Sequence, residues 1–262
     1  MDLGLKDRVA LVAASSTGLG KAVALGLARE GAKLALCART QSTLDSAAGE
    51  IGRETGVEVL ARAIDVKVYD QVRAFVAEIA AHFGRLDICV ANAGGPPSKS
   101  FADTTVDDWH TAAELNLMST VYLAKETLPI MQQRRWGRFI AITSVTVKQP
   151  LDGLILSNAI RTGVLGLVKS LANEYGPYNV LVNNVCPGFT ATARLNELAV
   201  TLAASAGVSA ADIEERWASQ APLGRIGQPE EFANLVVFLA SERASYITGE
   251  SIAVDGGLVK GL

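Results

Sequence analysis

Short apolar runs alternate with longer stretches of helical period along almost the whole chain of 262 residues. The runs are apolar throughout rather than on alternate residues, so both faces of each strand are expected to be covered. This pattern restricts the chain to an α/β fold: a doubly wound parallel sheet of about seven strands with helices on both faces. The expected strands are 8–14, 33–38, 57–63, 87–92, 138–144, 180–185 and 251–255. The expected helices are 18–30, 43–54, 69–83, 106–134, 154–175 and 229–241.

The chain is expected to form a single domain over residues 1–262, because no linker or internal repeat interrupts it. Hydrophobic residues make up 49% and charged residues 19%, a balance typical of a globular protein. Only the segment 190–220 departs from the alternation of strand and helix. It is rich in alanine and its helix caps look weak, so it is expected to be a helical, lid-like segment over the carboxyl edge of the sheet.

Charge and cysteine usage exclude several classes of partner. The formal net charge is -3 and no basic stripe is present, so neither nucleic acid nor a membrane surface is an expected partner. The first residues lack the long apolar stretch of a signal peptide, and no apolar run approaches the roughly 18 residues that span a bilayer. Cys37, Cys89 and Cys186 lie in apolar, strand-like runs. They are expected to be buried reduced thiols of a cytoplasmic protein, with neither a disulfide nor a metal site.

The turn after the first strand is a candidate nucleotide site. Its small residues would let the backbone approach a pyrophosphate, and the following helix would supply N–H donors and a positive dipole end. An ordinary strand-to-helix turn is the alternative, but the position directly after the first strand favours the nucleotide site. The candidate residues are Ala14, Ser16, Thr17, Gly18, Leu19 and Gly20.

Arg39 ends the second strand, where an acidic residue would bind the ribose 2′-hydroxyl of NAD(H). A guanidinium can instead take a 2′-phosphate in charge-assisted hydrogen bonds. The sequence therefore favours NADP(H) over NAD(H), with a simple solvent-exposed arginine as the alternative.

Further motifs are spaced along the rest of the chain. One of them is the C-terminal segment PLGRIGQPEEF…FLASERASYITGESIAVDGG. The others are Asp65-Val66, the ANAG of Asn92, Ala93 and Gly94, and the PGFTAT of Pro187, Gly188, Thr190 and Thr192. With the glycine turn, these motifs resemble the short-chain dehydrogenases/reductases, most closely the 3-oxoacyl-[acyl-carrier-protein] reductase branch, over nearly the whole chain. The resemblance implies a Rossmann fold, with Asp65-Val66 near the adenine and Thr192 at the nicotinamide carboxamide. Ala14 stands at the first glycine of the family's turn.

The resemblance also maps the family's catalytic tetrad onto Asn116, Ser144, Ser157 and Arg161. It implies that Asn116 holds an ordered water and that Ser144 donates to the substrate carbonyl oxygen. The family has tyrosine and lysine at the other two positions. A phenol beside a cation can act as a general acid, whereas an aliphatic hydroxyl is a feeble one and a guanidinium stays charged. Arg161 could still hold the ribose hydroxyls of the cofactor or stabilise an alkoxide.

Lys148, just past Ser144, is the nearest substitute acid, with a solvated loop lysine as the alternative. We therefore expect an NADP(H)-dependent oxidoreductase that reduces a small carbonyl compound, such as a 3-oxoacyl thioester, by an atypical proton route. A nucleotide-binding protein with little redox turnover and a lyase or isomerase on the same scaffold remain as alternatives. The resemblance also implies a homotetramer, built through the helices 106–134 and 154–175 and the C-terminal strand.

Overall fold

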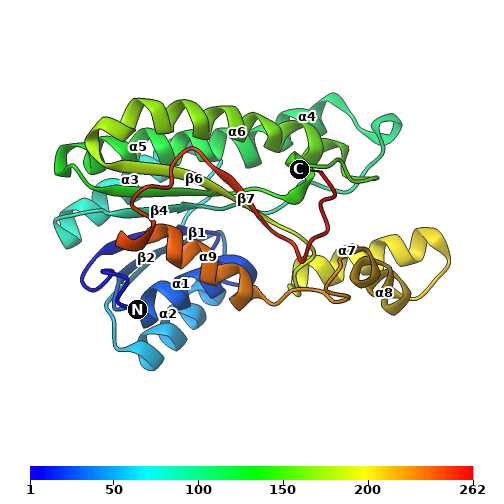
Figure 1. Ribbon diagram of the computed structural model, residues 1–262, viewed down its shortest axis with the longest axis horizontal. Helices are drawn as coiled ribbons and strands as arrows, with labels where there is room; N and C mark the ends of the chain where they lie inside the picture. The colour runs from blue at the N-terminus through cyan, green and yellow to red at the C-terminus, as the bar shows by residue number, and fades with distance from the viewer. Residues whose placement is uncertain (262) are drawn as a thin grey trace.

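The computed structural model describes residues 1–261 apart from the side chain of Ser205, so Leu262 of the expected domain lies outside the described residues. Seven parallel strands form one sheet in the order β3-β2-β1-β4-β5-β6-β7 (Figure 1). The strands are β1 Val9–Ala13, β2 Lys33–Ala38, β3 Val59–Ala63, β4 Ile88–Ala91, β5 Gly137–Ile142, β6 Val180–Pro187 and β7 Ser251–Val254. The chain reverses direction across the sheet between β1 and β4, which makes the sheet doubly wound. The expected fold class is thereby confirmed.

Helices cover both faces of the sheet. The residues of β1 alternate between two cores: Ala10 and Val12 pack with one, Val9 and Leu11 with the other. Both sets are buried, which explains why the run is apolar at every position. The first core is closed by α1 Gly18–Arg29, α2 Gln41–Thr55 and α9 Pro229–Ala240, and the second by α3 Tyr69–Phe83, α5 Ser119–Arg134 and α6 Ile155–Tyr175. No helix within residues 1–261 combines the length and apolarity needed to cross a bilayer.

The helix expected over 106–134 is not uniform. It consists of α4 Val106–Ala113, a π-helical turn over Glu114–Met118, and α5. In this turn the N–H of Ser119 donates to the carbonyl of Glu114, five residues back. The hydroxyls of Ser119 and Thr120 donate to the carbonyls of Leu115 and Asn116, so these polar groups stay paired. The wider turn changes the direction in which Asn116 leaves the helix.

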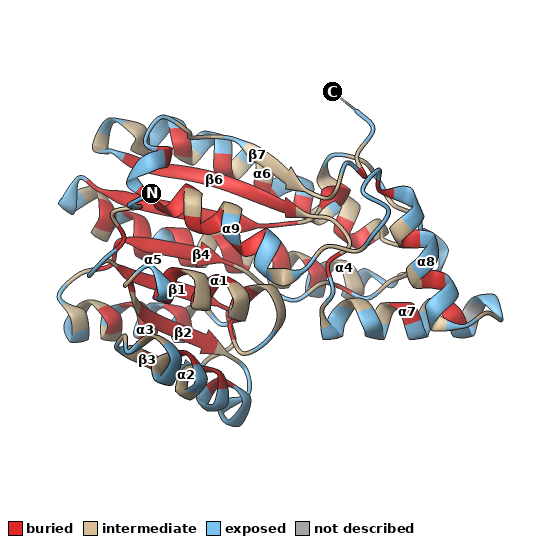
Figure 2. Ribbon diagram, turned by 60° about the horizontal axis from the view of Figure 1, so that its bottom comes forward, coloured by how far each residue is buried: buried red, intermediate tan, exposed pale blue. Residues whose placement is uncertain are grey.

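Residues 190–220 form α7 Ala193–Ala206 and α8 Ala210–Gln220, a helical pair that projects from the body of the molecule (Figures 1 and 2). The expectation of weak caps was wrong. Thr192 accepts from the N–H of Leu195, and Ser209 forms a capping box with Asp212. The aspartate satisfies the box as well as the more usual glutamate would. The pair has a small core of its own, in which Ala199, Ile213 and Trp217 are buried.

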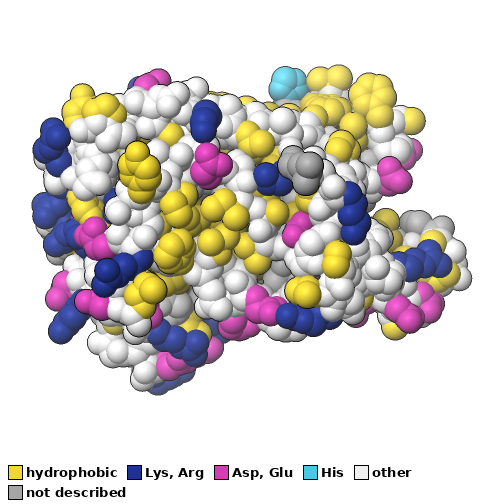
Figure 3. Space-filling view, in the orientation of Figure 1, with side chains coloured by type: hydrophobic (Ala, Val, Ile, Leu, Met, Phe, Trp, Pro, Cys, Tyr) yellow, Lys and Arg dark blue, Asp and Glu magenta, His cyan; other side chains and the backbone are white. Residues whose placement is uncertain are grey.

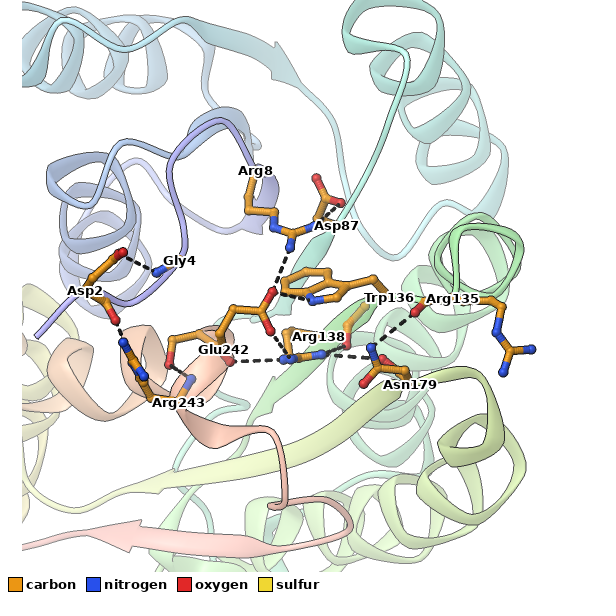
Figure 4. Close-up of polar contacts among 12 residues, drawn as sticks. Asp2, Gly4, Arg8, Asp87, Arg135, Trp136, Arg138, Asn179, Glu242 and Arg243 are labelled. Carbon is orange, nitrogen blue, oxygen red and sulfur yellow. Dashed lines mark hydrogen bonds and ion pairs between the residues drawn. The ribbon is translucent and has the colours of Figure 1, made fainter.

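At the amino edge of the sheet, a charged network joins segments that are distant in sequence (Figure 4). Arg138 on β5 is 1% exposed, and its guanidinium lies 4.2 Å from the centre of the Trp136 ring. Arg8 covers the same ring at 3.7 Å. Glu242 completes the network, 2.8 Å from Arg8 Nη2 and 3.7 Å from Arg138 Nη2. Each buried cation here has a carboxylate close by.

Candidate active site

The candidate nucleotide turn lies at the carboxyl edge, between β1 and α1. Ala14 has a φ of 49° and Gly18 a φ of 55°, both in the left-handed region that favours glycine. A Cβ on Gly20 would lie 2.2 Å from the carbonyl oxygen of Ala14, so only glycine fits there. The turn thus brings backbone unusually close to the start of α1, and Ala14 adopts its conformation at a steric cost.

The start of α1 is open to a ligand. Thr17 precedes the helix without a side-chain cap, so the first N–H groups have no protein partner from that hydroxyl. Ser16 and Leu19 of the turn are partly exposed. Arg39, after β2, is exposed, and its side chain makes no hydrogen bond or ion pair within the described chain. These groups fit the phosphates of a dinucleotide, the anions that a helix N-terminus and a free guanidinium attract.

Asn92 lies between β4 and the nucleotide turn. Its Nδ2 donates to the carbonyl of Ala13 at 3.3 Å and would lie 3.0 Å from a Cβ on Gly20. Ala93 and Gly94 follow it, partly buried and exposed respectively. Asp65, by contrast, is engaged locally, because its carboxylate accepts from the N–H of Lys67 and lies 3.7 Å from the Lys67 ammonium.

Val66 is buried in the core between β3 and α3. At the carboxyl end of β6 lies Pro187, and a Cβ on the next residue, Gly188, would lie 2.7 Å from Cα and Cβ of Asp255. Thr190 is buried and donates to the carbonyl of Gly188. Thr192 lies 3.4 Å from the Cβ position of Gly18, so the start of α7 meets the nucleotide turn.

Asn116 and Arg161 converge on one acceptor. The carbonyl oxygen of Gly94 accepts from Asn116 Nδ2 at 2.8 Å and from Arg161 Nη2 at 3.2 Å. Asn116 is 4% exposed, and its Oδ1 has no hydrogen-bond partner in the described structure. A buried amide oxygen left free in this way is an acceptor for a water or a ligand group.

Arg161 is held by backbone carbonyls alone. Its Nη1 donates to Thr143 at 2.8 Å and to Ile142 at 3.3 Å, in addition to the bond to Gly94. It is 7% exposed, and burial lowers the pKa of its guanidinium to about 10. The position thus keeps a fixed, buried positive charge beside the end of β5.

Ser144 and Ser157 are linked through Thr146, a residue that the sequence patterns did not single out. Ser144 Oγ accepts from the N–H of Thr146, which leaves the proton of Ser144 free for another oxygen. Thr146 Oγ1 and Ser157 Oγ are 3.1 Å apart, and either can donate to the other. Thr146 lies two residues after the predicted site residue Ser144, and this closeness was the sign in the sequence that Thr146 could belong to the site.

Lys148 does not join this group. It is exposed at the end of the short 3-10 turn Val145–Val147, and its side chain makes no hydrogen bond in the described structure. Its charge lies near Cys186, where it opposes the rise in thiol pKa that burial causes. The lysine therefore flanks the site without contacting Ser157 or Arg161.

A cavity of about 350 Å³ opens under α7 and α8. Phe189 and Trp217 stack in its wall, with ring centres 4.9 Å apart. Leucines supply most of the remaining apolar lining, and Ser98, Gln149, Asp152 and Gln220 add polar groups. Such a mixed lining suits a small organic substrate better than an ion.

Residues 13–259 match a family model described as enoyl-(acyl carrier protein) reductase. The 3-oxoacyl-[acyl-carrier-protein] reductase of Aquifex aeolicus (strain VF5) is 35% identical over 98% of this chain and 100% of that protein. The chain belongs to the short-chain dehydrogenase/reductase family. The acetoacetyl-CoA reductase of Shinella zoogloeoides is 32% identical over 96% of this chain and 98% of its own length.

A solved structure of L-sorbose reductase from Gluconobacter frateurii, in complex with NADPH and L-sorbose, is also similar to this short-chain dehydrogenase/reductase. It has a TM-score of 0.95 and 36% identity, and the match covers 100% of both chains. The family's relatives are thus reductases that match this chain from end to end. Motifs located most of the groups described above, whereas Thr146 and the cavity emerged only from the folded chain.

Proposed function

We propose that this protein is an NADPH-dependent reductase of a small carbonyl compound, such as a 3-oxoacyl thioester. The observation that carries the proposal is the convergence of Asn116 and Arg161 on the Gly94 carbonyl, with Asn116 Oδ1 buried and free. A chain that only bound nucleotide would have little use for a free acceptor and a fixed cation at this end of the groove. The names of the relatives support reduction of a carbonyl.

The proposed cofactor residues fit a nicotinamide dinucleotide. The glycine turn from Ala14 to Gly20 would cradle the pyrophosphate, and Arg39 would take the 2′-phosphate that distinguishes NADPH from NADH. Asn92, Ala93 and Gly94 would line the ribose, with Asp65 and Val66 toward the adenine. Pro187, Gly188, Thr190 and Thr192 would border the nicotinamide. When bound, NADPH supplies the hydride for the reduction.

Ser144 and Arg161 would stabilise the negative charge that develops on the substrate oxygen. Ser144 already accepts from Thr146, so its own proton is free to be donated to that oxygen. Arg161 is charged, buried and fixed by carbonyls, and a preorganised cation of this kind acts strongly where water is excluded. Ser157 would take part through Thr146 as a weak relay rather than as the acid.

The proton would reach the alkoxide from water. Asn116 Oδ1 would hold one such water, and Lys148 would deliver protons to it from the solvent side of the turn. This route would replace the family's tyrosine by a water held at Asn116 and by Lys148. Lys148→Ala should then lower turnover and alter the alkaline limb of the pH–rate profile. Lys148→Arg should show the same two changes.

The decisive experiment mixes purified protein with NADPH, records the shift in NADPH fluorescence, and then follows NADPH consumption across thioesters, ketones and aldehydes. Binding followed by consumption is the expected result. Binding without consumption by the wild type, but with consumption by Ser157→Tyr/Arg161→Lys, would favour the nucleotide-binding alternative. Loss of a carbonyl without loss of NADPH would favour a lyase or isomerase. If neither protein turns over, the roles given to Asn116 and Ser144 lose their support.

We further propose a homotetramer in the cytoplasm. Strand β7 is the edge strand of the sheet and is only half-buried, and hydrophobic side chains gather on the face where β7 and α9 lie (Figure 3). An apolar edge of this kind is usually covered by a second copy. The three buried free thiols support a reducing compartment. Light scattering that shows only a 27.5 kDa monomer at micromolar concentration would contradict the tetramer.

A further inference from the structure

Arg161 is a buried cation without a counter-ion. Within residues 1–261 no carboxylate lies at ion-pair distance from its guanidinium, and its only acceptors are neutral carbonyls. Isolating a charge from water in this way is costly unless an anion compensates it. Since the protein does not provide that anion, a ligand is the remaining source.

A second guanidinium approaches from the lid. Arg194 lies in the first turn of α7, and its Nη2 donates to the carbonyl of Pro96 at 3.0 Å. Its side chain is half-exposed, and its Nη1 lies 3.6 Å from the carboxylate of Glu197, a solvent-screened pair that leaves the charge of Arg194 available to a ligand. Gly95 lies between the two arginines: a Cβ there would be 3.9 Å from Arg194 Nε and 4.0 Å from Arg161 Nη2. The two like charges weaken each other, because Arg194 helps to lower the pKa of Arg161. An anion placed between them would relieve that repulsion.

Arg194 on α7 connects the arginine pair to the cavity under α7 and α8. Leu198 and Leu202 follow Arg194 at four-residue intervals, so all three lie on one face of α7. Both leucines line the cavity, as does Ser98 just past the Pro96 carbonyl. A ligand that extends from the arginines into the cavity would therefore place its charge at the arginines and its chain against the leucines and the Phe189–Trp217 stack, away from the exposed carboxylate of Asp152 in the same lining.

We propose that Arg161 and Arg194 bind the carboxylate of the substrate. The substrate is then an oxo acid, with a free carboxylate close to its ketone as in 2-oxo and 3-oxo acids and an apolar chain that lies in the cavity. This inference rests on the proposed carbonyl reduction, and it replaces the 3-oxoacyl thioester as the example substrate, because such a thioester has no negative charge beside its ketone. A guanidinium pair binds a carboxylate in charge-assisted, two-point hydrogen bonds.

The pyrophosphate of the cofactor is the other anion that could lie near Arg194. The start of α7 does meet the nucleotide turn, through Thr192 and Gly18. Arg194, however, reaches toward Pro96 after β4, and Arg161 is fixed at the end of β5, two strands from β1. Both guanidinium groups are thus held near the ends of β4 and β5 rather than at the nucleotide turn, which favours the substrate carboxylate.

The test compares each free acid with its neutral methyl ester, using 2-oxopentanoate and 3-oxohexanoate. Dissociation constants are measured by calorimetry on the protein saturated with NADPH, and turnover of the same compounds is recorded. The wild type should bind the acids at least about tenfold more tightly than the esters. Arg194→Gln should reduce that ratio by about tenfold and change the NADPH dissociation constant less than about twofold.

Arg216→Gln is the matched control, because it removes the same charge from an exposed position on α8. It should leave the acid-to-ester ratio unchanged. If Arg194→Gln weakens NADPH binding and leaves the ratio intact, the anion is the cofactor pyrophosphate and the inference is overturned. If wild type binds and reduces acid and ester equally, the inference fails while the proposed reduction stands. If wild type binds no NADPH, the proposed function itself fails.

Discussion

Two buried arginines, Arg138 and Arg161, lie at opposite edges of the same sheet and differ in what surrounds them. Arg138 at the amino edge packs on Trp136 and lies 3.7 Å from a carboxylate oxygen of Glu242. Arg161 at the carboxyl edge has only backbone carbonyls. Burial lowers the pKa of both to about 10, but only Arg138 has a carboxylate that opposes the shift.

This difference in surroundings distinguishes a structural site, at Arg138, from a site that binds a ligand, at Arg161. At the amino edge the charges compensate one another within the chain, so the network stabilises the contacts between β1, β5 and the segment after α9. Each edge has one buried polar atom without a hydrogen-bond partner, Arg138 Nη2 at the amino edge and Asn116 Oδ1 at the carboxyl edge. Arg138 Nη2 still lies 3.7 Å from the Glu242 carboxylate, whereas Asn116 Oδ1 lies beside a cation, Arg161, that has no carboxylate partner in the described structure. Features that cost free energy of folding in this way cluster at functional sites, where a bound ligand offsets the cost.

The largest expected effect is on catalysis at the carboxyl edge. Arg161→Ala should lower kcat/KM for the carbonyl substrate by about 100-fold or more, because a preorganised cation beside the developing alkoxide is lost. Ser157→Ala should lower it by no more than about threefold, since a weakly acidic hydroxyl contributes little as an acid. Steady-state kinetics on both variants measure the ratio. Equal losses would show that Ser157 and Arg161 act as one unit and would contradict the subsidiary role given to Ser157.

The next effect is on stability, and it tests the comparison itself. Arg138→Met should lower the free energy of unfolding by about 2 to 3 kcal/mol, because Glu242 and Trp136 lose their buried partner. Arg161→Met should lower it by no more than about 1 kcal/mol, because removal of an uncompensated charge offsets the lost hydrogen bonds. Urea unfolding without cofactor gives both values. Similar losses would mean that three carbonyls compensate a guanidinium as well as a carboxylate does.

A smaller effect is expected at Arg39, the exposed cation of the carboxyl edge. Arg39→Asp should weaken NADPH binding by about tenfold and NADH binding far less, because only NADPH has the 2′-phosphate. Fluorescence titration with the two cofactors measures the ratio. Arg53→Asp, an equally exposed charge reversal on α2, is the control and should change neither. An equal loss for both cofactors would remove Arg39 from the 2′-phosphate site.

The smallest effect is expected at Ala14. Ala14→Gly should raise the free energy of unfolding by about 0.5 to 1 kcal/mol, because glycine adopts a φ of 49° without the clash of a Cβ. Ala13→Gly, one residue earlier in the buried strand β1, should destabilise instead. Thermal and urea unfolding of both variants measure whether the free energy of unfolding rises or falls in each. A loss at both positions would show that the turn is not strained.

The sequence predicted the fold well because strands that are buried on both faces are apolar at nearly every position, a pattern that is easily recognised. All seven strands and five of the six expected helices lie within a few residues of their expected bounds, and the sixth is interrupted by a π-helical turn. The pattern could not show the π-helical turn, since an apolar periodicity continues across Glu114–Met118 and only the hydroxyls of Ser119 and Thr120 mark it. It also missed the caps of α7 and α8, which were expected to be weak, although Thr192 caps α7 and Ser209 forms a capping box with Asp212.

The candidate site was predictable only where motifs are local. Asn116, Ser144, Ser157 and Arg161 could be found by spacing, but their bonds could not. That Arg161 has no carboxylate depends on which carbonyls end β4 and β5, and thus on the folded sheet. Arg194 is invisible in the sequence, because its approach to Arg161 depends on how α7 lies over Gly95.

The π-helical turn sets a limit on how this protein can be engineered. Redesign of the segment from Val106 to Arg134 as one ideal helix would add regular hydrogen bonds and would score as an improvement in any protocol that rewards helical regularity. It would also turn Asn116 around the helix axis and away from the Gly94 carbonyl. Deletion of a single residue in this turn should therefore raise the stability of the protein and disrupt the candidate active site. Efforts to stabilise the protein should leave this segment unchanged.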